Sequence, residues 1–191
     1  MNLNGTILDL GGSNKAGYQE LIGGDHKFVT VNFDEAFGCD QVFDIEKRFP
    51  IDDDTHDHVI CLNVLEHIYN FHNVINESFR VLKKDGSALF ITPFFFQIHG
   101  SPDDYFRYTE STLLRAFKEA GYVDVKIEKL GYGLFSAFYQ VIGGGVRPLF
   151  LKEALKRFSI GLDKFIAKLI PRYEGIRNRI PIGFILTAKK S

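Results

Sequence analysis

The residues best placed to do chemistry are polar side chains at the ends of four successive apolar segments in the N-terminal half of the chain. They are Asp9 with Gly11 and Gly12, then Asn32 and Asp34, then Asp44 with Ile45, and finally Asn63. Glycines let a backbone approach a ligand closely, and carboxylates accept hydrogen bonds from it. Each position alone would be an ordinary solvated strand end, but the set of four favours a ligand site.

The spacing indicates which part of a ligand each position could contact. Asn32, with Asp34 as a displaced substitute, lies roughly 20 residues beyond the glycines, where a polar side chain can reach a ribose diol. Asp44 can accept a hydrogen bond from an adenine amine while Ile45 flanks the ring. The turn after Asp9 lacks the Gly-Lys-Ser/Thr ending of a P-loop. This turn is therefore not expected to hold a triphosphate.

A second group of reactive residues follows the fifth apolar segment. His99 is the first candidate for a general base, and Asp104 is an alternative. Arg107 can clamp a carboxylate or a phosphate, or it can form an ion pair with a neighbouring aspartate. The rings of Tyr105 and Tyr108 can lie against an acceptor molecule, or they can pack in the core.

Two further ligand classes are not expected. His56 and His58 alternate with carboxylates, in a pattern that can ligate a metal. This segment is the turn into an apolar strand, where acidic side chains usually face water, so we expect no metal. Nucleic acid is disfavoured as a partner because residues 1–146 carry a formal net charge of −9.

Alternating apolar strands and amphipathic helices must position these residues. The expected strands are Thr6–Leu10, Phe28–Phe33, Gln41–Asp44, His58–Leu62, Ala88–Pro93, Val123–Leu130 and Ile182–Lys189. The expected helices between them are Asn70–Leu82 and Glu110–Ala120. This alternation predicts a largely parallel sheet in one α/β domain that spans residues 1–191.

Residues 131–180, before the last strand, are expected to form a helical insertion. Its longest element is an amphipathic helix over Leu149–Ile170, with Gly161 as a candidate break. Apolar side chains occupy one side of this helix and basic side chains the other, and residues 147–191 carry a formal net charge of +8. Such a helix can lie on an anionic membrane surface, or it can pack on the sheet or on a second subunit of a homodimer.

Several blocks within residues 5–130 together resemble one known family. They are Ile7-Leu8-Asp9-Leu10-Gly11, Phe43-Asp44-Ile45, Asn63-Val64-Leu65-Glu66-His67, Arg80-Val81-Leu82-Lys83-Lys84-Asp85-Gly86 and Ala120-Gly121-Tyr122. Their order and separation resemble class I S-adenosylmethionine-dependent methyltransferases of the ubiquinone/menaquinone-biosynthesis-like type (methyltransferase type 11). The segment from Pro93 to Thr109 is similar to a subgroup linked to bacterial surface-polysaccharide biosynthesis.

The resemblance implies a Rossmann-like, seven-stranded sheet whose last strand is antiparallel. It implies S-adenosylmethionine as the cofactor, with contacts at Asp9, Gly11, the end of the second strand, Asp44 and Asn63. The implied activity is methyl transfer to a small or glycan-like acceptor, and oxygen is the acceptor atom that we expect.

Departures from the family pattern keep two other functions open. Ser13 and Lys15 replace the second and third glycines of the usual Gly-x-Gly-x-Gly turn. One alternative is a binding protein of the same fold without turnover, and the other is a nicotinamide-dependent oxidoreductase. Because Cys39 and Cys61 lie far apart and no signal-peptide pattern precedes the first strand, we expect a cytoplasmic protein, either free or peripheral to the inner membrane face.

Overall fold

Seven strands form one mixed sheet in the computed structural model, which describes residues 2–191. The strands are β1 (Gly5–Leu10), β2 (His26–Asn32), β3 (Gln41–Val42), β4 (His56–Leu62), β5 (Leu82–Pro93), β6 (Val123–Leu130) and β7 (Gly183–Lys189). They lie in the order β3-β2-β1-β4-β5-β7-β6, and β7 runs antiparallel to both of its neighbours. The predicted seven-stranded α/β sheet with an antiparallel last strand is confirmed.

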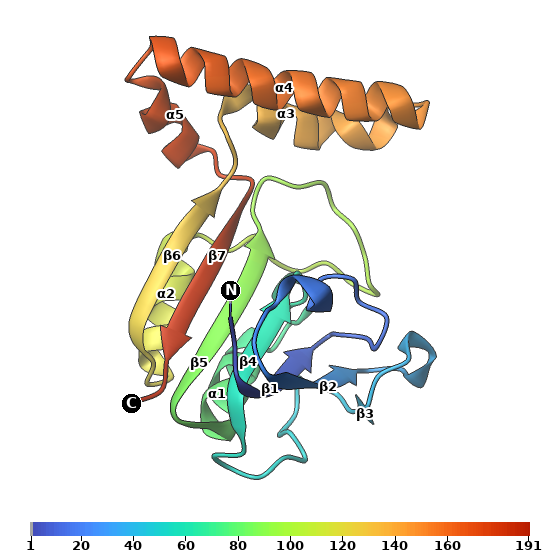
Figure 1. Ribbon diagram of the computed structural model, residues 1–191, viewed down its shortest axis with the longest axis vertical. Coiled ribbons are helices and arrows are strands. Elements are labelled where there is room, and N and C mark those ends of the chain that lie inside the picture. Colours follow the sequence, from blue (N-terminus) through green and yellow to red (C-terminus); the bar gives the residue numbers. More distant parts are fainter. Residues whose placement is uncertain (1) are drawn as a thin grey trace.

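Helices α1 (Phe71–Val81) and α2 (Glu110–Glu119) cover one face of this sheet, behind it in Figure 1. The main core lies between them and the strands, and its largest buried side chains include Phe49, Phe90 and Phe117. The other face carries the 3₁₀ helix η1 (Gln19–Leu21) and a small apolar cluster around Ile7 and Ile60.

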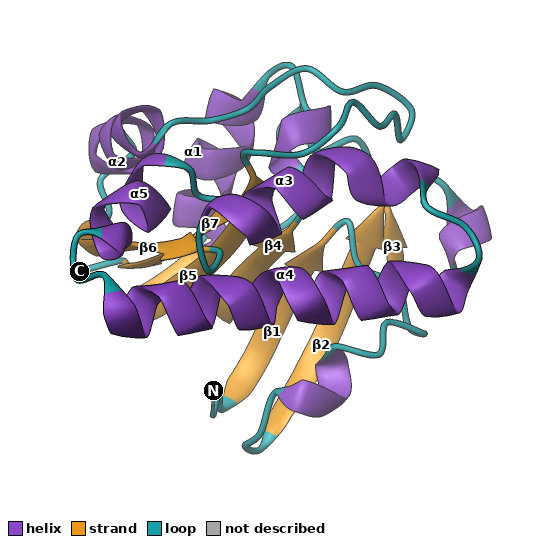
Figure 2. Ribbon diagram, turned by 90° about the horizontal axis from the view of Figure 1, so that it is seen from above, coloured by secondary structure: helices purple, strands orange, loops and turns teal. Residues whose placement is uncertain are grey.

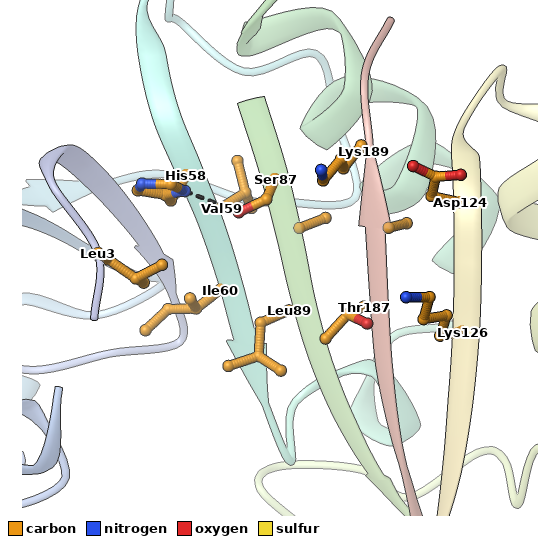
Figure 3. A pocket seen from close by; sticks show the side chains of 12 residues that line it. Leu3, His58, Val59, Ile60, Ser87, Leu89, Asp124, Lys126, Thr187 and Lys189 are labelled. Atoms are coloured by element: carbon orange, nitrogen blue, oxygen red, sulfur yellow. Dashed lines mark hydrogen bonds between the residues drawn. The ribbon is translucent and has the colours of Figure 1, made fainter. Parts of the chain in front are cut away.

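Part of this second face is open. Figure 3 shows a cavity of about 260 Å³ there, lined by strand side chains such as Ile60, Leu89 and Thr187. At its edge His58 Nδ1 lies 2.7 Å from Ser87 Oγ, and His58 Nε2 lies 3.1 Å from the Asn4 carbonyl oxygen. His58 of β4 therefore links β5 through Nδ1 and the N-terminal segment through Nε2.

A layer of three helices lies over the carboxyl ends of the parallel strands, at the top of Figure 1 and across the view of Figure 2. They are α3 (Leu134–Ile142), α4 (Leu149–Leu169) and α5 (Tyr173–Arg179), with the 3₁₀ helix η4 (Gly143–Gly145) after α3. Helix α4 continues through Gly161 without a break. This layer matches the predicted position of the helical insertion.

A buried carboxylate ties the three helices together. Asp163 of α4 is fully buried and accepts hydrogen bonds from the backbone N–H groups of Phe135 (3.0 Å) and Ser136 (2.7 Å), in the first turn of α3. It also accepts a hydrogen bond from the hydroxyl of Tyr173 in α5. The N-terminus of α3 therefore has its orphan amides satisfied by another helix.

The outer surface of α4 is partly apolar. Phe150, Phe158 and Phe165 are 75%, 65% and 59% exposed, whereas the residues of α4 that are buried are Ser159 and Asp163. The predicted apolar side is thus only partly turned inward, and the hydrogen bonds between α4 and α3 are made by Asp163. Over residues 2–191, no helix has the length and apolar character that crossing a membrane requires.

Candidate functional site

A cavity of about 340 Å³ opens at the carboxyl ends of β1 to β4. Five of the residues predicted for the adenosyl ligand line it: Gly11, Asn32, Asp44, Ile45 and Asn63. The carboxyl ends of neighbouring parallel strands meet at one edge of a sheet, so residues up to 52 positions apart in the chain come together here. We call it the first cavity.

The floor of the first cavity is the glycine turn after β1. Gly11 has φ +77°, and a Cβ at this position would lie 2.3 Å from Val64 Cγ2, so no larger residue fits without a shift. The side-chain amide of Asn32 donates to the carbonyl oxygens of Gly11 and Gly12, both at 3.2 Å. Asn32 therefore holds the turn in place, a role that its expected contact with ribose did not include.

Three predicted ligand residues do not line this cavity. Asp9 is fully buried, and it accepts a 2.7 Å hydrogen bond from the Tyr18 hydroxyl. Gly12 lies directly against it, because a Cβ there would come within 2.3 Å of the Asp9 carboxyl group. Asp34 instead accepts from the Ala36 N–H at 2.8 Å and caps the 3₁₀ helix η2 (Glu35–Phe37).

Burial sets the protonation of Asp9. Desolvation raises its pKa from 3.8 to about 6, and the hydrogen bond from Tyr18 offsets only part of that rise. One of its oxygens, Oδ1, has no hydrogen-bond partner among the described residues. Asp9 therefore supports the glycine turn from below and is shielded from whatever occupies the first cavity.

The opposite rim of the first cavity is polar and exposed. Asp44 accepts a 2.9 Å hydrogen bond from the Glu46 N–H and lies 3.1 Å from Lys47 Nζ. That hydrogen bond and the lysine lower the pKa of Asp44, so its carboxylate stays ionised and available as an acceptor. Asn63, which follows β4, adopts a left-handed φ of 54°, which turns the chain sharply at the cavity edge.

A second cavity, of about 330 Å³, begins at Asn63 and extends over the ends of β5 and β7. Its polar lining comes from Glu66, Thr92, His99 and Gln140, and Phe96 and Ile182 add apolar walls. Gln140 belongs to α3, so the helical insertion contributes to the lining of this cavity. We call it the second cavity.

The 3₁₀ helix η3 (Leu65–His67) separates the two cavities, because His67 lines the first and Glu66 the second. Glu66 is fully buried, and burial raises its pKa from 4.5 to about 7. His67 Nε2 and His99 Nε2 lie 3.7 Å and 3.9 Å from Glu66 Oε1. These three side chains form what we call the Glu66 cluster.

The segment 94–108 is fastened over η3 by its own backbone. The N–H groups of Tyr105 and Phe106 donate to the Glu66 carbonyl oxygen at 2.8 Å and 3.2 Å. The Tyr108 hydroxyl donates to the Leu65 carbonyl oxygen at 2.8 Å. Tyr108 is only 3% exposed and packs in the core, so the prediction that it contacts the acceptor is wrong.

Two other predicted residues of this segment bind each other. Arg107 forms a bidentate ion pair with Asp104, at 2.5 Å and 2.7 Å, and Asp104 also accepts from the His99 N–H at 2.8 Å. The Arg107 guanidinium lowers the pKa of Asp104 strongly, which makes it a poor base. The acceptor clamp expected at Arg107 is therefore replaced by a bond that shapes the loop. Tyr105 lines the first cavity instead of the second.

The sequence alone did not single out Glu66 and His67 as site residues. They appeared only within a block that carried a family resemblance. The signal that could have found them is their position directly after a predicted strand, next to Asn63. Their approach to His99, 32 residues later, depends on the path of the 94–108 segment.

Comparison with known proteins places this geometry in context. The family model described as "Methyltransferase domain" matches residues 14–90, which include most of the residues that line the first cavity, together with η3, but not Gly11 or the lining residues after Ile68. No curated protein sequence matches the chain. A phosphoethanolamine N-methyltransferase from Haemonchus contortus, crystallised with S-adenosylhomocysteine, is 13% identical with a TM-score of 0.61. The alignment covers 100% of this chain and 49% of that one, so the chain spans about half of its length.

Two further structures are similar over most of their length. A methyltransferase from Archaeoglobus fulgidus, described as SAM dependent, is 17% identical with a TM-score of 0.61, and the alignment covers 98% of this chain and 86% of that one. The [4+2]-cyclase SpnF is 15% identical with a TM-score of 0.60, at 98% and 76% coverage. Methyltransferases and a cyclase thus share this architecture, so the architecture alone does not prescribe the reaction. The protein has the class I methyltransferase fold, and its residues 14–90 match the methyltransferase-domain family.

Proposed function

We propose that this protein transfers a methyl group from S-adenosylmethionine to an oxygen of a small or glycan-like acceptor. The observation that carries the proposal is the pair of cavities that meet at Asn63, at the carboxyl edge of a class I methyltransferase sheet. A transferase needs two adjoining sites so that donor and acceptor can meet in line. A binding protein needs only one.

The first cavity fits the donor. Asp44 would accept from the adenine amine, Ile45 and Phe43 would flank the ring, and Gly11 leaves room for close approach to the backbone. When bound, S-adenosylmethionine supplies an electrophilic methyl group on a sulfonium. Asn63, which belongs to both cavities, would mark the side from which the acceptor approaches.

The second cavity fits a polar acceptor of modest size. Thr92 and Gln140 can hydrogen-bond to hydroxyl groups, and Phe96 offers an apolar face of the kind that sugars stack on. An attacking hydroxyl must lose its proton as the oxygen–carbon bond forms. His99 lines this cavity and is the residue that we propose takes that proton.

Donor binding tests the first cavity. Calorimetry with S-adenosylhomocysteine should show binding to the wild-type chain, weakened by ~1–3 kcal/mol in Asp44→Ala through loss of a charged hydrogen bond. Asp52→Ala removes another exposed aspartate, from the turn before β4, and should bind like wild type. Unchanged affinity in Asp44→Ala would rule out the proposed adenine contact. Absence of any S-adenosylhomocysteine binding by the wild-type chain would rule out the proposed function.

Turnover tests the second cavity. His99→Ala should slow the release of S-adenosylhomocysteine by ~10²–10⁴-fold and leave the affinity for S-adenosylhomocysteine intact. The assay uses a panel of sugars and sugar phosphates with S-adenosylmethionine, and the fastest acceptor is kept. The control is His72→Ala, which changes an exposed histidine of α1. Equal rates in the two variants would show that His99 takes no part in the reaction.

A further inference from the structure

Glu66 is a buried carboxylate to which no other side chain donates a hydrogen bond among the described residues. Its residue is 0% exposed, and neither Oε1 nor Oε2 has a hydrogen-bond partner among the described residues. A carboxylate that leaves water without donors or a counter-cation is strongly disfavoured, so a native fold keeps one only where something compensates it. The nearest guanidinium, that of Arg107, is already paired with Asp104.

In their neutral forms, the two histidines beside Glu66 would present nitrogens without a proton to it. His67 Nδ1 lies 2.5 Å from the Asp103 carbonyl oxygen, which can only accept, so the proton of the neutral ring is on Nδ1. His99 Nδ1 faces two acceptors, the Gln97 carbonyl oxygen at 3.3 Å and Asp104 Oδ2 at 3.4 Å. In both neutral rings the lone pair is therefore on Nε2, the nitrogen that points at Glu66.

This is the way that proteins orient histidines toward metals. Metal-bound imidazoles donate their other N–H to a carbonyl or carboxylate oxygen, which fixes the tautomer and the ring direction. Two imidazole nitrogens with one carboxylate form the ligand set of zinc and of other first-row divalent metals, and the remaining coordination positions stay open for water or substrate.

We propose that Glu66, His67 and His99 bind one divalent transition-metal ion, of which zinc is the representative. The three ligand atoms lie within 4.8 Å of one another. Ligands at about 2.0 Å from a tetrahedral ion stand about 3.3 Å apart, so side-chain rotations can close the site. The open positions would face the second cavity, which Glu66 and His99 line.

The inference deepens the proposed function and partly rests on it. An acceptor hydroxyl bound to such an ion would be a stronger acid than a free one. His99 cannot be a metal ligand and a free base at the same time, so the metal-loaded chain activates the acceptor by coordination, whereas the metal-free chain relies on His99 itself. Metal binding can be measured without donor or acceptor, which separates the two proposals.

Calorimetry with zinc chloride alone, on protein first dialysed against a chelator, should give one site per chain. Glu66→Gln, which keeps the side-chain shape, should weaken that site at least tenfold, and His99→Ala should do the same. The matched control His72→Ala should bind like wild type. Cobalt in place of zinc should give visible absorption bands of a low-symmetry site, and these should be lost in Glu66→Gln. Circular dichroism melts would confirm that each variant is folded.

Absence of a stoichiometric site in the folded wild-type chain would overturn the metal proposal, as would equal zinc affinity in wild type and Glu66→Gln. Neither result would touch the donor site, because S-adenosylhomocysteine binding to the first cavity is measured separately. Conversely, zinc binding by a chain that does not bind S-adenosylhomocysteine would support the metal site and remove the methyl-transfer function.

Discussion

Asp9 and Asp44 show how position decides what a carboxylate can do in this site. Asp44 lies on the exposed rim of the first cavity, where a backbone N–H and Lys47 keep it ionised. Asp9 lies beneath the glycine turn without solvent contact, and its single short hydrogen bond comes from Tyr18. Asp44 can bind a ligand directly, whereas Asp9 acts on the ligand only through the glycine turn.

The raised pKa of Asp9 makes the stability of the fold depend on pH. In the unfolded chain this carboxyl ionises near pH 3.8, and in the folded chain near pH 6. Between these values, ionisation therefore lowers the free energy of the unfolded state more than that of the folded state. The free energy of unfolding should therefore fall between about pH 4 and pH 6, by up to about 3 kcal/mol, and then level off.

Asp9→Asn should remove this component while keeping a side-chain oxygen that can accept from Tyr18. Urea unfolding at a series of pH values measures it, as the difference in unfolding free energy between wild type and variant. Between about pH 4 and pH 6 the unfolding free energy of wild type should fall relative to that of Asp9→Asn, and above pH 6 the difference should stay constant. Parallel profiles for the two proteins would mean that Asp9 is not desolvated in the folded chain.

At this scale the sequence identified the residues that follow strands and missed those that meet through loops. Asp44, Ile45 and Asn63 could be predicted because a parallel sheet brings its carboxyl ends to one edge. His99 was predicted as a site residue, but its approach to Glu66 and His67 was not, because a hydrogen bond to the Asp103 carbonyl orients His67, and no local pattern encodes that bond.

The segment 94–108 is the element that completes the site, and one ion pair defines its shape. Asp104 binds the Arg107 guanidinium through both oxygens and also holds the His99 N–H. Its side chain is only 4% exposed, so solvent screens the pair weakly. The same carboxylate therefore fixes both the loop and the backbone of the proposed base.

Asp104→Ala should leave Arg107 unpaired and lower the free energy of unfolding by roughly 3 kcal/mol. Hydrogen exchange should show faster exchange at the His99 amide, while the amides of β4 and β5 keep their protection. Arg115→Ala, which breaks an exposed pair with Glu119 in α2, should destabilise the fold much less, because water screens that pair. Similar losses in the two variants would contradict a structural role for the Asp104–Arg107 pair.

Elements with a clear hydrophobic period were predictable, and those without one were not. Helices α1, α2 and α4 end within one or two residues of their expected bounds, because each carries an apolar stripe. Helix α3 lies in an uncharged, glycine-containing run that is apolar on most sides, so no polar face marks it as a helix. Its start is set by Asp163, which is far away in the sequence and caps its first turn.

At the scale of the whole molecule, an acidic sheet domain carries a basic helical layer. Residues 147–191 hold a formal net charge of +8, and α4 carries both exposed aromatic rings and basic side chains. An exposed apolar surface rimmed by basic side chains is the pattern of a helix that rests on an anionic membrane. We propose that α4 makes this contact, which would bring the second cavity close to a lipid-linked acceptor.

Sedimentation with liposomes tests this proposal. The chain should bind anionic but not neutral vesicles, with each nearby basic residue contributing about 1 kcal/mol, and binding should fall in high salt. The variant changes Lys152, Lys156, Arg157 and Lys164 to serine and should not bind. A control with the same charge change replaces four exposed lysines of the sheet domain: Lys15, Lys27, Lys84 and Lys118. Failure of the wild-type chain to bind anionic vesicles at low salt would leave α4 as a surface for subunit packing.

The position of η3 has a consequence for how ligands would affect each other. Occupants of the two cavities touch neighbouring residues of one three-residue turn, His67 on one side and Glu66 on the other. Any displacement of that turn by one ligand changes the free energy of the other. Thermodynamic reciprocity then requires that the factor by which the first ligand alters the affinity of the second equals the factor in the opposite direction. The binding of donor and acceptor would therefore be coupled: occupancy of either cavity would change the affinity of the other through a single turn of backbone.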